Sequence, residues 1–377
     1  MSYFSFLIKD LLIMMISILK SVNDIDRTLW DSLLKHKIPF LDYDWIRIWC
    51  NNFVREQQSK IYLVSKKSGE VSGIIPLYEH QEKQLGIPFK GFSFTANSHS
   101  YRTQLIASPQ DKGKVLNAWL DNIFKNERFD FIKFKEFLLD EEVLNHLENK
   151  KIKFSLEEEK RPPYIDLEGD WQNYFNSLRG HFRRNLRRRL RNAEKQFGKV
   201  EYRVFDGSKE QLEPFVLQGL ELEASGWKGK QGSAILKNPN VKQLYLDIAR
   251  VYFYKKQLHL GALYFGERMV AFNFSLIANQ TFYLLKVAYD EEVPKFSPGQ
   301  IMIFFLLQIL FEQKIKRFDF LGPSMPWKLE WTQKYNQHFT LYIYGNNSKG
   351  QFLYLVNKKM LPALRKIKFL KKLKNAI

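Results

Sequence analysis

The chain has 377 residues, 45% of them hydrophobic and 15% aromatic, so it can fill the cores of two domains and extended disorder is not expected. Its formal net charge of +19 favours an anionic partner, such as a phosphorylated cofactor, nucleic acid or an anionic membrane face, and does not choose among them. The single cysteine, Cys50, excludes an intrachain disulfide, and the seven histidines lack metal-ligand spacing, so no metal centre is expected.

Residues 1–22 form an apolar extension. Lys9 and Asp10 interrupt the apolar run 4–19, which is then too short to span a membrane. The run lacks the basic start and the small-residue cleavage site of a signal peptide. We expect a helix docked on the body or a loosely ordered extension, with interfacial membrane contact as the alternative.

A first domain is expected over residues 23–160. Residues 61–64 and 71–77 predict a hairpin, and further strand material lies within 92–107. The dipeptide Ser108-Pro109 predicts a helix start, and a strand is expected from residue 128.

Acidic and proline-rich residues 157–171 mark the boundary to a second domain, expected over 161–350. Residues 177–198 then predict an amphipathic helix with most of its seven arginines opposite an apolar stripe. The stripe consists of Leu178, Phe182, Leu186, Leu190, Ala193 and Phe197. Arg189 falls at the stripe's edge and is the candidate to point into a site. The other arginines form a solvated face or bind cofactor phosphates, an anionic acceptor or RNA.

A further helix is predicted from Ser208 to residue 224, followed by a glycine-rich loop that carries Trp227 and Lys228. Glu223 in the last turn is a candidate general base beside an acceptor pocket formed by that loop. A solvated glutamate at a helix end is the alternative. Residues 238–255 predict the next helix, and 258–265, 269–277 and 282–288 predict an antiparallel meander.

The sequence Ser297-Pro298-Gly299-Gln300 has the residues of a helix start: a cap, proline at the first helical position and the glutamine of a capping box. Gly299 offers no side chain, so an anion such as a pyrophosphate could approach the backbone N–H groups at the positive end of the helix dipole. The next strand is expected at 317–321.

The two halves share a pattern. Ser-Pro at 108–109 and Arg-Phe-Asp-Phe at 128–131 recur at 297–298 and 317–320, with the same spacing between the two motifs in each half. We interpret this as an internal duplication, with coincidence of two short motifs as the alternative. Because Gln110-Asp111 would replace Gly299-Gln300 in the first copy, only the second is expected to hold an anionic cofactor.

The meander, helix start and strand follow the order of the acyl-CoA N-acyltransferase (GNAT) fold. Residues 222–229, 232–235, 296–299 and 318–322, with Lys328 and Trp331, resemble the bacterial CelD-like GNAT group associated with cellulose biosynthesis, which is related to Fem aminoacyltransferases. The arginine-rich helix is similar too. The resemblance covers about residues 23–345. It implies an α/β (α+β) fold of tandem GNAT-like domains, each a mixed, mostly antiparallel sheet flanked by helices.

The resemblance also implies acyl transfer from acyl-CoA to an amine or hydroxyl of a cell-envelope or polysaccharide-related acceptor, without a metal. Pyrophosphate would bind at Ser297, Pro298, Gly299 and Gln300, and backbone N–H groups of Val287, Ala288 and Tyr289 would hold the thioester carbonyl. Glu223 would be the base. Asp319 and Lys328 would orient the acceptor or move protons, or form a structural ion pair, and Trp227, Lys228, Arg189 and Trp331 would contact substrate.

Two other functions stay open: a Fem-like aminoacyltransferase, and a non-catalytic GNAT-fold protein that binds anionic envelope components or RNA. The expected acceptor is a small molecule or a glycan- or lipid-linked precursor, while a nucleic-acid partner is not favoured. A cytoplasmic location is expected, with peripheral contact at the inner face of the membrane left open.

Residues 351–377 are expected to form a basic amphipathic tail. Leucine and isoleucine recur at spacing three, and eight basic residues occur between 358 and 374 without an acid. Such a helix suits an anionic membrane surface; docking on the body with a solvated basic face is the alternative.

Overall fold

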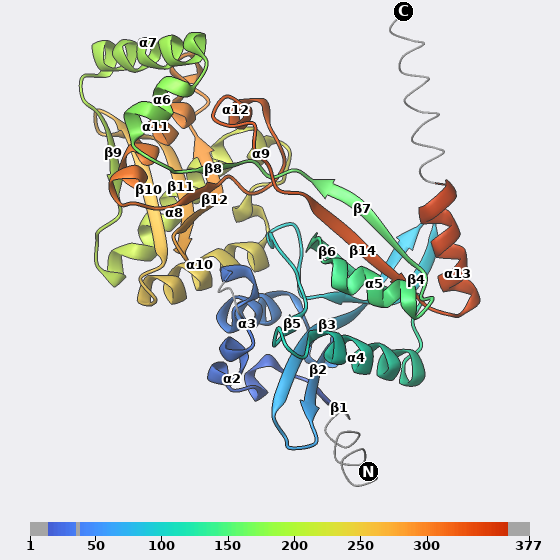
Figure 1. Cartoon of the computed structure of the whole chain (residues 1–377). Helices are drawn as coiled ribbons and strands as arrows, with labels where there is room; N and C mark the ends of the chain where they lie inside the picture. The colour runs from blue at the N-terminus through green and yellow to red at the C-terminus, as the bar shows by residue number, and fades with distance from the viewer. Residues whose placement is uncertain (1–13, 35–37, 361–377) are drawn as a thin grey trace, which may run out of the picture. The chain divides into compact units, whose positions relative to one another are not determined.

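The computed structural model describes residues 14–34 and 38–360 (Figure 1). The predicted helix of the basic tail lies beyond residue 360, outside the described residues, as do residues 1–13 of the apolar extension. The chain divides into two compact units. The first combines the chain up to Glu159 with the part from Gln337 onward, and the second is Lys160–Asn336.

The first unit contains a mixed sheet in the order β1-β2-β3-β4-β6-β14-β7, with β5 beside β3. Its strands are β1 (Met14–Leu19), β2 (Ser59–Lys66), β3 (Val71–Gln84), β4 (Ile87–Phe94), β5 (Ile106–Ala107), β6 (Phe131–Leu138), β7 (Phe154–Lys160) and β14 (His338–Tyr344). Its helices are α2 (Arg27–Ser32), α3 (Tyr43–Phe53), α4 (Lys112–Asn126), α5 (Glu141–Asn149) and α13 (Ser348–Leu355), with shorter turns η1 (Val22–Asp24), η2 (Pro39–Leu41), η3 (Glu56–Gln58) and η6 (Val356–Met360).

The second unit contains a sheet in the order β8-β13-β12-β11-β10-β9. Its strands are β8 (Tyr164–Asp166), β9 (Val200–Val204), β10 (Leu258–Phe265), β11 (Arg268–Ala278), β12 (Thr281–Tyr289) and β13 (Arg317–Asp319). Its helices are α6 (Trp171–Ser177), α7 (Gly180–Phe197), α8 (Lys209–Ser225), α9 (Trp227–Lys230), α10 (Pro239–Tyr254), α11 (Pro298–Glu312) and α12 (Pro326–Leu329), with turns η4 (Ile235–Lys237) and η5 (Pro294–Phe296).

Both sheets are mostly antiparallel and flanked by helices, which confirms the predicted fold class. Each unit runs a three-stranded meander, a helix and then a strand parallel to the third strand of the meander: β4 pairs with β6, and β12 pairs with β13. The element order of the two halves is therefore the same.

The repeated Ser-Pro motifs do not mark equivalent positions in these elements. Helix α4 runs from Lys112 to Asn126 and α11 from Pro298 to Glu312, so Lys112 corresponds to Pro298. The helix start predicted at Ser108-Pro109 lies too early, because Ser108 opens a turn in which its carbonyl accepts from the Asp111 N–H. Asp111 takes the cap position, where its carboxylate accepts from the Ser72 hydroxyl.

The apolar extension also differs from its prediction. Within the expected helix or loose segment, Met14–Leu19 is strand β1, paired antiparallel with β2 from Met14 opposite Lys66 to Leu19 opposite Ile61. An apolar, β-branched run gains backbone hydrogen bonds when it extends a sheet edge. The sequence of residues 14–19 alone does not show that the edge of β2 is available for pairing.

The second expected domain ends earlier than residue 350. Strand β14 pairs antiparallel with β6, from His338 opposite Leu138 to Tyr344 opposite Phe131, and so belongs to the first unit. None of the helices in the described residues is long and apolar enough to cross a membrane.

The second unit's sheet has two covered faces. On one, Phe215 of α8 packs edge-on against Phe272, and Tyr245 of α10 packs against Phe274. On the other, residues of α6, α7 and α11 form one core with strand residues such as Leu263 and Phe282. The predicted stripe of α7 lies in this core: Phe182, Leu186 and Ala193 are buried members, and Leu178, Leu190 and Phe197 are partly buried and pack against the core.

Candidate active site

The second unit's sheet opens between β12 and β13. The two strands pair in parallel from Thr281 opposite Arg317 to Tyr283 opposite Asp319, and β12 then continues along β11 to Tyr289. Its register with β11 shifts next to Leu284, which leaves Leu285 as the extra residue of a bulge. The three residues expected to hold a thioester carbonyl, Val287, Ala288 and Tyr289, lie in this continuing part of β12.

Helix α11 follows β12 after a short connection that includes η5. Ser297 precedes the helix with left-handed φ of 52° and makes no side-chain cap hydrogen bond, and Pro298 is the first helical residue. The N–H groups of Gln300 and Ile301 already donate to the Ser297 carbonyl, at 2.9 and 3.2 Å. The Gly299 N–H has no such partner among the described residues, so one donor of the first turn is available rather than several.

The space beside Gly299 is open. A Cβ added there would meet only the Tyr289 ring, at 3.8 Å. The helix start and the end of β12 are therefore neighbours.

Gln300 does not complete the predicted capping box. Its side-chain Nε2 donates to the Trp327 carbonyl at 3.1 Å, and its Oε1 accepts from the Trp331 indole N–H at 2.5 Å. These bonds tie the start of α11 to the segment that carries α12. Trp331, expected to contact substrate, is 1% exposed and packs edge-on against Phe182 in the core.

Lys328 is buried on α12, and its ammonium is surrounded by carbonyl oxygens. Its Nζ donates to the carbonyls of Leu321 at 2.6 Å and Pro323 at 3.1 Å, with a longer contact to Phe320. Burial lowers the pKa of Lys328 to about 8, while the Asp319 carboxylate acts in the opposite direction. The positive charges of Lys160 and Lys286 also lower this pKa.

Asp319 is fully buried at the end of β13. Its Oδ1 accepts from the Leu321 N–H at 2.9 Å, and its Oδ2 lies 3.4 Å from the Asn336 amide nitrogen. The carboxylate therefore shapes the turn that supplies carbonyls to Lys328, and it stabilises the ammonium electrostatically. Sequence reasoning missed Lys286 and Asn336; a lysine inside the apolar run 282–288 was the available signal for the first.

Glu223 lies near the end of α8 with a 6% exposed side chain, so it is not the solvated helix-end glutamate of the alternative. Its Oε2 accepts from the Ile235 N–H at 2.9 Å, which anchors η4 to α8 across the predicted glycine-rich loop, part of which is the short helix α9. The side chains of Trp227 and Lys228 in that loop lie outside the described residues. Arg189 is half-buried, in keeping with its place at the edge of the stripe.

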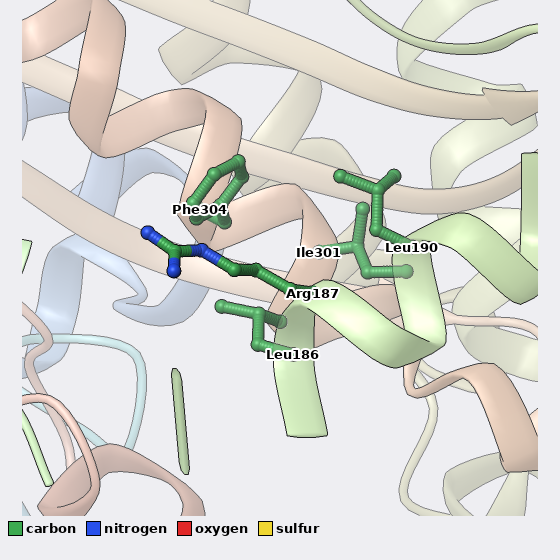
Figure 2. A pocket seen from close by; sticks show the side chains of 5 residues that line it. All are labelled: Leu186, Arg187, Leu190, Ile301 and Phe304. Atoms are coloured by element: carbon green, nitrogen blue, oxygen red, sulfur yellow. The ribbon is translucent and has the colours of Figure 1, made fainter. Parts of the chain in front are cut away.

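A small pocket lies between α7 and α11 (Figure 2). Leu186, Leu190, Ile301 and Phe304 line it, and Arg187 lies beside Phe304. It holds about 10 Å³, roughly the room that one water molecule needs, so it does not accommodate a donor or an acyl chain.

The corresponding helix start in the first unit is blocked. By the helix bounds, Gly113 of α4 corresponds to Gly299, and a Cβ at Gly113 would meet the side chains of His146 and Glu142 of α5 at 3.0 and 3.1 Å. The strand opening there is filled as well, because the Thr103 N–H donates to the Glu136 carbonyl and the Leu138 N–H donates to the Thr103 carbonyl. The obstruction comes from tertiary contacts, and not from Gln110 as the sequence suggested.

Within the described residues, no group of three or more histidine, cysteine, aspartate or glutamate side chains is placed to hold a metal ion.

Part of the sequence also matches the model of a known protein family. Residues 180–329, which include β9 to β13, match the family model described as an acetyltransferase (GNAT) domain. This part of the chain therefore has the GNAT acyltransferase fold. The CelD-like group remains a resemblance.

Solved structures share the fold over most of the chain. FemX is similar with a TM-score of 0.57 at 12% identity, covering 88% of this chain and 98% of that one. A conserved protein of unknown function from Bacteroides thetaiotaomicron has a TM-score of 0.56 at 13% identity, covering 87% and 100%. The C-terminal domain of a putative lysylphosphatidylglycerol synthetase from Agrobacterium fabrum has a TM-score of 0.53 at 11% identity, covering 89% and 98%. No curated protein matches the sequence.

Proposed function

We propose that the second unit transfers an acyl group from acyl-CoA to an amine or hydroxyl. The observation that carries the proposal is the open start of α11 at Gly299, beside the end of β12, within the segment that matches the GNAT model. An unpaired N–H at the positive end of a helix dipole favours an anion, and the donor pyrophosphate would supply it. Ser297, Pro298 and Gly299 would border this anion, and Gln300 would hold the helix start in place.

In the proposed reaction, the acceptor nitrogen or oxygen attacks the thioester carbonyl carbon directly. A new bond forms to that carbon, the C–S bond breaks, and the thiolate leaves and takes up a proton. Backbone N–H groups of Val287 to Tyr289 would stabilise the oxygen that becomes negative in the transition state. No covalent enzyme intermediate is required.

Two groups are suited to the proton transfer. Glu223 is the proposed base, because it is a buried carboxylate beside the loop that would border the acceptor. Lys328 is the second, because a lysine with a pKa of about 8 is partly neutral near physiological pH. Asp319 would set the charge and position of Lys328.

The acceptor we propose is an envelope or polysaccharide precursor, on the strength of the CelD-like resemblance. Similarity to FemX in fold also keeps an aminoacyl donor as a second candidate. The formal net charge of +19 is compatible with a nucleic-acid-borne donor of this kind.

A panel of acyl-CoA thioesters, tested for thermal stabilisation of the full chain, checks the proposal. A ligand at 100 times its dissociation constant adds about 2.7 kcal/mol to the free energy of unfolding, which is readily seen as a shift of the melting temperature. Stabilisation by one or more thioesters, and not by the bare acyl group, is expected. No shift with any thioester, together with activity that ribonuclease abolishes, would transfer support to the aminoacyl donor.

A further inference from the structure

Helix α7 carries a concentration of positive charge that its surroundings do not neutralise. Residues 179–197 contain seven arginines and a single acid, Glu194. The exposed arginines are Arg179, Arg184, Arg187, Arg188 and Arg191, and we call their surface the arginine face.

The arginines of α7, including the half-buried Arg183, have mostly neutral partners. Arg183 donates to the Leu178 carbonyl and to Asn176, and Arg188 donates to Asn185. Arg187 lies over the Phe175 ring at 5.1 Å, and Arg179 is 4.0 Å from Glu330, the limit of an ion pair. Among the described residues, Arg184 and Arg191 have no hydrogen-bond or ion-pair partner.

This arrangement works against the helix itself. Like charges three or four residues apart on a helix repel each other, and Arg184–Arg188 and Arg187–Arg191 are two such pairs. Some other basic side chains of the second unit do have carboxylate partners, as Arg250 has with Glu213 and Arg317 with Asp166. The arginine face therefore has unsatisfied capacity for an external anion.

The shape of the face indicates the kind of anion. The apolar stripe of α7 packs into the core along the helix, from Phe182 to Phe197, so α7 lies against its own unit and does not project. A helix held in this way presents its outer side as a continuous row of cations, which can lie on a plane of anionic headgroups.

The described residues from 160 to 200 also offer few platforms for bases. The large apolar side chains that are exposed in the described residues include none between residues 160 and 200. Binding of single-stranded nucleic acid relies on aromatic side chains on which bases stack. A surface of fixed cations without exposed aromatics suits lipid phosphates better.

We propose that the arginine face of α7 docks the protein on an anionic phospholipid surface by headgroup electrostatics alone, without insertion of α7 into the acyl region. The docking is independent of the proposed acyl transfer. The GNAT-like site lies in the same unit, so docking would bring that site to a membrane-borne acceptor.

Flotation of the full chain with vesicles tests the proposal. Recovery is expected with vesicles that contain phosphatidylglycerol, and not with phosphatidylcholine alone, and it should fall as salt is raised. Substitution of Arg184, Arg188 and Arg191 by Gln should weaken partitioning about 100-fold. Each basic residue near such a surface contributes a similar factor to the binding constant, and three of them are removed.

Two control variants make the result specific. Substitution of Lys237, Lys256 and Lys316 by Gln removes the same charge from exposed positions of the second unit and should leave partitioning nearly unchanged. Substitution of the same three arginines by Lys keeps the charge and should keep partitioning.

Equal recovery of the Arg-to-Gln variant and the wild type would overturn the proposal. Equal losses of vesicle partitioning in the Arg-to-Gln and Lys-to-Gln variants would also overturn it, because binding would then depend on the net charge of the protein and not on the arginine face. Binding of a structured RNA that the Arg-to-Gln change abolishes, without vesicle binding by the wild type, would also overturn it and assign the face to RNA. Acyl-CoA stabilisation should be unchanged in all three variants.

Discussion

Lys328 combines burial with three carbonyl contacts, and its pKa is lowered to about 8 from 10.5. Between these two values the unfolded chain binds more protons at this residue than the folded chain does. The free energy of unfolding should therefore rise with pH in this window. Below the folded pKa, the cost of burying the ammonium is constant.

We predict that the wild type gains about 2 kcal/mol relative to Lys328→Met between about pH 8 and about pH 10. The difference between the two proteins removes the contribution of other titrating groups. Urea unfolding at the two pH values measures it. A constant difference between wild type and variant would show that the pKa of Lys328 is not lowered in the folded chain.

Glu223 has a structural bond to the Ile235 N–H as well as its proposed role as base. Glu223→Gln keeps the shape and an acceptor oxygen, so it separates the two roles. Turnover should fall by about 100-fold or more with donor affinity little changed, as for a lost general base. A lower acyl-CoA affinity together with a lower melting temperature would mean that Glu223 only holds the segment before Ile235 in place.

A pH profile of turnover distinguishes the two candidate bases. Activity that rises with an apparent pKa near 8 would point to Lys328, and a profile without such a rise would leave Glu223 as the base.

At the scale of elements, the apolar patterns predicted the second unit well, although the capping box expected at Ser297 and Gln300 does not form. The meander, α8, α10 and α11 lie where their patterns indicate, because each depends on its own sequence. Strand β1, strand β14 and the start of α4 were missed, because each is fixed by a partner far away in the sequence.

The candidate site divides in the same way. The position of Gly299 at a helix start could be predicted, because Ser297 and Pro298 are typical residues of a helix start. The partners of Gln300 and the carbonyls around Lys328 could not, because they come from segments that only the fold brings together. Trp331 is of a residue type that often contacts ligands, but in this fold it is buried in the core.

The tie between α11 and the segment around α12 rests on Gln300. Gln300→Met should lower the free energy of unfolding by about 1–3 kcal/mol, because it leaves the buried Trp331 indole N–H without its partner. Gln308→Met on the same helix is the matched control, since Gln308 has no such bond within the described residues, and it should be nearly neutral. Chemical denaturation of both variants measures the difference; equal stabilities would contradict the tie.

At the scale of the whole molecule, two units with one element order differ in their helix starts. Gly299 is open, whereas Gly113 is covered by His146 and Glu142. We therefore propose one donor site for each chain, in the second unit. Calorimetric titration with acetyl-CoA should give one site per chain.

The most direct test of this claim is that titration repeated with Gly299→Asp and Gly299→Ala. An aspartate in the first turn interacts favourably with the positive end of the helix dipole, and it replaces glycine, a poor helix former. The free energy of unfolding should therefore be kept or increased. The charge and bulk of the aspartate should nevertheless lower acetyl-CoA affinity by about 100-fold or more, while Gly299→Ala, with room beside Tyr289, should still bind. Wild-type affinity in a folded Gly299→Asp protein would contradict a donor site at the start of α11.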